Sequence, residues 1–121
     1  MTITAGIDVG STYTKSIIID HDNTVLGQDL RPTGFKLGQV ARQSFDACLG
    51  EAGMNESDVD YTIATGIGRH LVEFKDIHVT DLTASARGAR ALFPGTRAVL
   101  DVGGQTMKAS RIDGESKVLS F

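Results

Sequence analysis

The chain has 121 residues, of which 40% are hydrophobic and 22% charged, a composition typical of a globular domain with its own core. The formal net charge is −3, and the 12 lysines and arginines are scattered along the chain, which argues against a nucleic-acid or anionic-membrane surface. Cys48 is the only cysteine, so an internal disulfide is excluded. Asp8 interrupts the first apolar run, so we expect no signal peptide. The longest apolar stretch is too short to cross a bilayer, and a cytoplasmic location is the default expectation.

The first third of the chain predicts three short strands. Runs of β-branched residues cover positions 3–8, 14–20 and 24–30, and turn-forming residues separate them. Tight connections of this kind favour an antiparallel meander. Pro32 cannot pair inside a sheet, so the meander is expected to end there.

The middle of the chain predicts a helix and then a strand. Apolar residues recur at spacings of three and four from Phe35 to Ala52, and Gly53 is suited to end that helix. Residues 59–65 read as a strand, which leads into the glycine-containing loop 66–69.

The last third predicts one more helix and three strands. The helix is expected from Asp81 to Phe93, with Thr80 or Asp81 as its cap and a Pro-Gly pair after it. Strands are expected at 97–101, 106–112 and 117–121, with a hairpin turn at 113–114. The result is an α/β domain with a mixed sheet in βββαβα order followed by further strands, organised as a single domain over residues 1–121.

One pattern occurs twice. "GIDVGSTYTKSIII" begins at Gly6, and "AVLDVGGQTMKASRI" begins at Ala98. At a constant offset of 93 residues, aspartate, glycine and lysine recur at matching positions, which are Asp8 and Asp101, Gly10 and Gly103, and Lys15 and Lys108. Each copy is a strand that ends near a carboxylate, a turn of glycine and small polar residues, and a second strand that carries the lysine.

Two such hairpins are suited to a magnesium-bound polyphosphate. Glycine lets an anion approach the turn amides closely, and successive N–H groups can form a nest for a phosphate oxygen. We expect Asp8 and Asp101 to hold a hydrated Mg²⁺ ion and Gln105 to orient the attacking water. The expected phosphate contacts are Gly10, Ser11, Thr12, Lys15, Gly103 and Gly104.

Purely structural interpretations stay open beside these. Asp-Gly pairs are common in hairpins, and lysines on strand faces, including Lys15 and Lys108, are often only solvated. Arg69 could reach a phosphate or a partner's carboxylate, or serve no such purpose. A buried structural thiol is expected at Cys48. None of the three histidines has a metal-ligand companion at suitable spacing; these are His21, His70 and His78.

The two repeats resemble the paired phosphate loops of the acetate-kinase/actin/Hsp70-like ATPases. Together with "ATGIGR" at 64–69 and "ARGARALFPGTRAVLDVGGQ" at 86–105, they are most similar to one family, the ATPase components of 2-hydroxyacyl-CoA dehydratases and benzoyl-CoA reductases, of BadF/BadG/BcrA/BcrD type. The resemblance implies a ribonuclease-H-like, actin-like fold. It also implies a cytoplasmic ATPase of anaerobes that uses ATP hydrolysis to drive an electron into a partner acting on a CoA thioester.

Further implications concern cofactors and partners. In this family an iron–sulfur cluster bridges two ATPase subunits and is held by cysteines, in a homo- or heterodimer. Members continue past the position of Phe121 into a cysteine-containing loop and a second domain with the adenosine site. Cys48 lies in no such motif, so no cluster ligand is expected in this chain. We therefore expect an N-terminal ATPase domain that is inactive alone.

Two alternatives remain at this point. The first is a sugar or small-acid kinase domain of the same superfamily, although no substrate-binding insertion or catalytic base stands out. The second is a non-catalytic fragment that binds nucleotide without turning it over.

Overall fold

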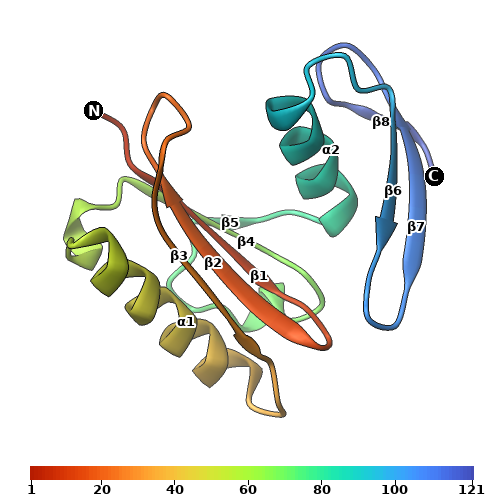
Figure 1. The fold of residues 1–121 in the computed structure, drawn as a ribbon. Helices are drawn as coiled ribbons and strands as arrows, with labels where there is room; N and C mark the ends of the chain where they lie inside the picture. Colours follow the sequence, from red (N-terminus) through yellow and green to blue (C-terminus); the bar gives the residue numbers. More distant parts are fainter. The chain divides into compact units, whose positions relative to one another are not determined.

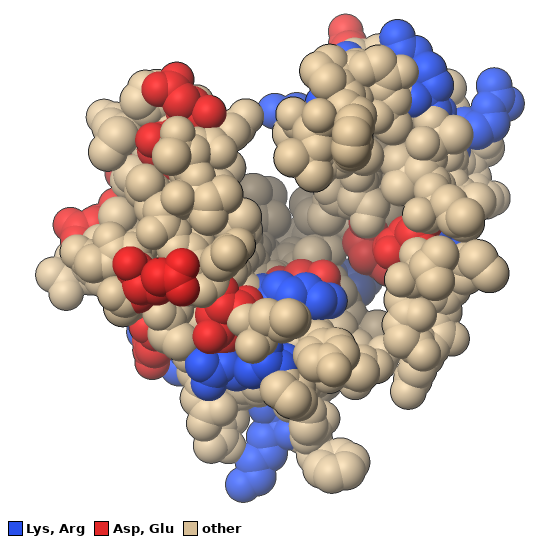
Figure 2. Space-filling view, in the orientation of Figure 1, with Lys and Arg blue, Asp and Glu red and all other residues tan.

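The computed structural model describes every residue from Met1 to Phe121. The chain forms two compact units, Met1–His78 and Val79–Phe121, each with its own sheet and its own α-helix (Figure 1). The expectation of one domain over the whole chain stays a prediction. On the face drawn in Figure 2, acidic and basic side chains are interspersed with uncharged surface. Neither helix is long and apolar enough to cross a bilayer.

The first unit is built on a five-stranded mixed sheet. Strands β1, β2 and β3 form the predicted antiparallel meander, and β4 and β5 add to β1 in parallel, giving the order β3-β2-β1-β4-β5. The strands are β1 (Thr4–Val9), β2 (Tyr13–Ile19), β3 (Val25–Pro32), β4 (Tyr61–Thr65) and β5 (Ile77–His78). The predicted α/β class with a mixed sheet is therefore confirmed.

Helix α1 (Leu37–Ala52) covers one face of this sheet. The central strand β1 alternates, and Ala5, Ile7 and Val9 are at most 1% exposed because they point into the core. The Phe45 ring, also fully buried, stacks on Phe74 with ring centroids 4.8 Å apart. This core fixes the strand ends that carry Asp8 and its turn.

The helix ends as predicted and approaches β3 very closely. Gly53 adopts a left-handed conformation with φ of 68°, and its N–H donates to the carbonyl of Gly50. At Gly27 in β3, a side chain would lie 2.6 Å from the carbonyl oxygen of Cys48. Only glycine permits this contact between strand and helix.

The second unit is smaller. Helix α2 (Asp81–Leu92) packs on a three-stranded antiparallel sheet of order β6-β7-β8, formed by β6 (Ala98–Val102), β7 (Met107–Ile112) and β8 (Val118–Ser120). The hydroxyl of Thr80 accepts a hydrogen bond from the N–H of Thr83, so Thr80 is the cap of α2. The three predicted strands of this region are all present.

Several short elements were not predicted from the sequence. Strand β5 has two exposed residues and therefore no alternation to detect. Two short 3₁₀ helices, Glu56–Asp58 and Arg69–Leu71, also went unpredicted. The second begins at Arg69, which the sequence placed in a loop. The observed order is βββαββαβββ.

Replacing Gly27 with alanine should lower the free energy of unfolding by about 1–3 kcal/mol, because the added methyl group overpacks the contact with α1. Urea unfolding followed by circular dichroism measures this change. Gly50→Ala is the matched control, since nothing lies within 4 Å of its added carbon. That substitution should stabilise the protein by up to about 1 kcal/mol through helix propensity. Equal effects of the two substitutions would show that α1 does not press on Gly27.

Candidate functional site

The first repeat forms a tight turn between β1 and β2. The N–H of Gly10 donates to the carbonyl of Tyr13 at 3.0 Å, and a Cβ on Gly10 would lie 2.8 Å from that carbonyl oxygen. The turn residues Ser11 and Thr12 are exposed. The turn therefore needs glycine at its first position and presents its polar residues to solvent.

Thr33, the residue that follows β3, stabilises this turn through hydrogen bonds. Its hydroxyl donates to the carbonyl of Gly10 at 2.8 Å, and its N–H donates to the carbonyl of Thr12 at 2.9 Å. It also shares a buried hydrogen bond with the hydroxyl of Thr14. This role of Thr33 was not predicted from the sequence, because its partners lie more than 18 residues away and only the folded meander brings them near.

Asp8 and Lys15 face each other across β1 and β2. They are paired in the strand register, and Lys15 Nζ lies 3.2 Å from Asp8 Oδ2. Both side chains are partly exposed, at 40% for Asp8 and 49% for Lys15. An ion pair this exposed contributes about 0–1 kcal/mol, so the lysine can exchange one anionic partner for another at little cost.

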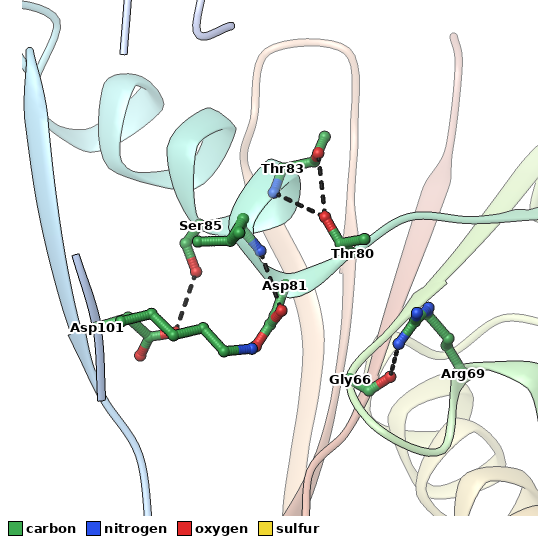
Figure 3. Close-up of polar contacts among 9 residues, drawn as sticks. Gly66, Arg69, Thr80, Asp81, Thr83, Ser85 and Asp101 are labelled. Atoms are coloured by element: carbon green, nitrogen blue, oxygen red, sulfur yellow. Dashed lines mark hydrogen bonds and ion pairs between the residues drawn. The ribbon is translucent and has the colours of Figure 1, made fainter. Parts of the chain in front are cut away.

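The loop after β4 packs against the end of β1. Gly66 has φ of 89°, and a Cβ there would clash with the Val9 carbonyl oxygen and lie 2.6 Å from Asp8 Oδ1. The N–H of Gly68 donates to the same Val9 carbonyl at 3.1 Å. Arg69 donates from its guanidinium to the carbonyl of Gly66 at 2.9 Å (Figure 3). The two glycines thus hold a backbone loop against the Asp8 carboxylate, and Arg69 supports that loop.

The second repeat builds the same turn in the other unit. The N–H of Gly103 donates to the carbonyl of Thr106 at 2.8 Å, the counterpart of the bond between Gly10 and Tyr13. A Cβ on Gly103 would lie 3.1 Å from the Thr106 carbonyl oxygen. Gly104 and Gln105 are exposed at the tip. The repeat in sequence is therefore a repeat in backbone structure.

The environment of Asp101 differs from that of Asp8. Asp101 and Lys108 are cross-strand partners in β6 and β7, as Asp8 and Lys15 are in β1 and β2. Lys108 nevertheless pairs with Asp81, the first residue of α2. The Asp101 carboxylate accepts a hydrogen bond from the hydroxyl of Ser85 at 3.4 Å (Figure 3). The hydrogen bond from Lys108 lowers the pKa of the Asp81 carboxyl, although burial opposes the shift.

His21 lies between β2 and β3, outside both repeats. Contrary to expectation, His21 has neighbours of metal-ligand type, since its ring nitrogen and the carboxylates of Asp20 and Asp22 lie within 4.8 Å of one another. Asp20 Oδ1, however, already accepts the backbone N–H groups of Asp22 and Thr24, as in an ordinary turn between strands.

His70 and His78 touch edge to face, with ring centroids 4.5 Å apart. Loss of some surrounding water lowers the pKa of His78, and the neighbouring charges of His70, Arg69 and Lys75 lower it further.

Comparison with known proteins places the chain among ATPases. The model of the BadF/BadG/BcrA/BcrD ATPase family matches residues 5–121. One subunit of the benzoyl-CoA reductase of Thauera aromatica is 38% identical over 128 residues, covering 100% of this chain and 44% of that protein. The family resemblance inferred from the motifs is thereby confirmed.

Solved structures agree on the fold. Component A of (R)-2-hydroxyglutaryl-CoA dehydratase from Acidaminococcus fermentans matches with a TM-score of 0.91 at 30% identity, over 99% of this chain and 46% of that one. The 2-hydroxyisocaproyl-CoA dehydratase activator from Clostridium difficile, with bound ADPNP, matches at 0.87 and 26% identity, over 98% of this chain and 44% of that one. A hexokinase of the ROK type from Thermus thermophilus, 16% identical with a TM-score of 0.71, shares the fold alone. This chain spans a little under half the length of the three activator and reductase relatives.

The close contact at Gly66 gives a testable consequence for Asp8. Gly66→Ala should destabilise the first unit by more than Gly34→Ala, because both glycines have positive φ but only Gly66 would also clash. Left-handed backbone costs a residue with a side chain about 1–2 kcal/mol, so Gly34→Ala measures that cost alone. Chemical denaturation of both variants gives the comparison. Equal losses of stability would mean that the loop does not press on Asp8 and Val9.

Cys48 should be chemically inert in the folded protein. It is fully buried, and burial raises the pKa of its thiol to about 11, with smaller contributions from the charges of Glu51 and Asp29. At pH 8 only about one thiol in a thousand is then the reactive thiolate. Ellman's reagent should label the native protein far more slowly than the urea-unfolded protein. Equal labelling rates would contradict the burial of the Cys48 thiol, and Cys48 would again be a candidate cluster ligand.

Proposed function

This chain belongs to the BadF/BadG/BcrA/BcrD ATPase family, and from that premise we propose that it holds the magnesium-bound phosphates of ATP in an activating ATPase. The observation that carries the proposal is the same glycine turn in both repeats, each placed after a strand that bears an aspartate. The region that matches this chain makes up a little under half of each relative named above.

The residues of both turns suit phosphate and magnesium. Gly10 and Gly103 make the tight turns possible, because a Cβ at either position would meet the carbonyl oxygen three residues later. The exposed amides at the tips of these turns can then approach a phosphate oxygen. Asp8 in the first unit and Asp101 in the second each offer carboxylate oxygens, the ligands that Mg²⁺ prefers, and can bind a hydrated ion. When bound, the metal neutralises charge on the phosphates.

Each remaining predicted residue has a role in this proposal. Ser11, Thr12 and Gly104 provide amides and hydroxyls at the exposed tips of the turns. Lys15 leaves its exposed pair with Asp8 and binds a phosphate oxygen when the nucleotide is present. Gln105, exposed beside Gly104, orients the attacking water through its side-chain amide.

We further propose that the hydrolysis drives electron transfer. The relatives include one subunit of a benzoyl-CoA reductase and activators of 2-hydroxyacyl-CoA dehydratases, so the partner is an enzyme acting on a CoA thioester. As a dimer, the ATPase would draw this electron from an iron–sulfur cluster. Cys48 is the chain's only cysteine and lies in the core, so we assign it no part in binding that cluster.

The alternatives are separated by what stimulates turnover. A sugar or small-acid kinase would consume ATP in proportion to added acceptor, whereas an activator would respond to its reductant and dehydratase or reductase partner. A chain that binds nucleotide weakly and responds to neither is a non-catalytic module. The similarity to the hexokinase, at 16% sequence identity, shows a shared fold and does not support a kinase activity.

Asp8→Asn and Asp101→Asn should each weaken magnesium-dependent ADP binding by about tenfold or more, because each removes a charged ligand of the cation. Isothermal titration of the complete ATPase with ADP, in Mg²⁺ and in EDTA, measures the effect. Asp46→Asn is the control, since it removes the same charge from an exposed position on α1. Unchanged binding in both turn variants, or loss of binding in the control as well, would contradict the assigned roles.

A further inference from the structure

The two repeats place a lysine at matching positions but give it different partners. Lys15 pairs with Asp8, its neighbour across the strands. Lys108 has the same register relation to Asp101 but pairs instead with Asp81 on α2. Because the backbone turns are alike, the difference comes from α2, whose first residue supplies a competing carboxylate.

We infer that Asp81 is a positioning residue that draws Lys108 away from Asp101 and so keeps the Asp101 carboxylate available to a divalent cation. The inference rests on the proposed function, which assigns Asp101 to the metal. It adds a residue outside both repeats and makes the two aspartates unequal. Asp101 is the stronger cation ligand, and Asp8 is the one that shares its charge with a lysine.

Electrostatics explains why the diversion matters. Two carboxylates paired with two lysines carry no net charge, so a cation would have to displace an ammonium group at each. With Lys108 held by Asp81, the Asp101 carboxylate keeps its negative charge and accepts only the hydroxyl of Ser85. A neutral donor orients this carboxylate without neutralising it.

The start of α2 is a favourable place for the competing carboxylate. Thr80 caps the helix, and Asp81 follows as its first residue, where the helix dipole stabilises negative charge. The backbone N–H of Leu82 also donates to Asp81 Oδ1 at 3.1 Å. Asp81 is thus held at both oxygens, by Leu82 at Oδ1 and by Lys108 at Oδ2.

The test uses Mn²⁺ as a paramagnetic probe of the nucleotide-free chain. Mn²⁺ bound at Asp101 broadens the amide NMR signals of Gly103 and Gly104. In Asp81→Asn, Lys108 is free to pair with Asp101, so half-broadening should need about fivefold more Mn²⁺ because the ammonium group now competes at that carboxylate. The double variant Asp81→Asn with Lys108→Met should return to the affinity of the unchanged protein.

Two controls separate positioning from simple loss of structure. Glu115→Gln removes one negative charge from an exposed turn of the same unit and should leave the Mn²⁺ dependence unchanged. The amide chemical shifts of α2 in the same NMR spectra should show that this helix is intact in each variant. A structural role for Asp81 would leave the double variant as weak as Asp81→Asn, and that result would overturn the inference.

The experiment also distinguishes this inference from the proposed function. Equal Mn²⁺ dependence in the unchanged protein and Asp81→Asn would overturn the role of Asp81 alone. If Mn²⁺ does not broaden Gly103 and Gly104 in the unchanged protein, the metal role of Asp101 is wrong and both proposals fall.

Discussion

A backbone hydrogen bond from glycine to the carbonyl three residues later shapes both repeats. It joins Gly10 to Tyr13 in one unit and Gly103 to Thr106 in the other. The bond closes each turn so tightly that a side chain at the glycine would meet the accepting carbonyl, at 2.8 Å and 3.1 Å. The strand pairing on either side then follows, and with it the register that sets each aspartate opposite a lysine.

The two turns rest on different supports. In the first unit, a 16-residue helix and a buried aromatic pair stabilise the sheet, and Thr33 and Gly68 hold the strand ends from two sides. In the second unit, a three-stranded sheet and the shorter α2 do this work, and polar side chains of α2 reach the repeat directly. The same backbone turn is therefore fixed mainly by packing in one unit and by polar contacts from a helix in the other.

Local pattern was enough to predict most of the elements. β-branched runs located the three strands of the meander, apolar spacing located α1, and Gly53 marked its end because a left-handed residue was needed there. The family could be recognised from the sequence because each of its motifs is a contiguous stretch of residues. Strand β5 was not predicted, because two exposed residues show no alternation of apolar and polar side chains. The ion pair between Lys108 and Asp81 was not predicted for another reason. Strand register alone favours Asp101 as the partner of Lys108, and only the placement of α2 brings Asp81 within reach. The metal and phosphate roles of the turn residues stay predictions.

The two outer strands of the five-stranded sheet differ from its centre. At one edge, β3 carries Pro32, which has no N–H to donate, an ion pair between Asp29 and Arg31, and a register shift against β2 at Ile18 and Ile19. At the other, β5 stops after two residues. Charge, proline, irregular register and shortness are the features that discourage an edge from recruiting a foreign strand. These features make both edges of the first unit's sheet poor templates for pairing with a foreign strand.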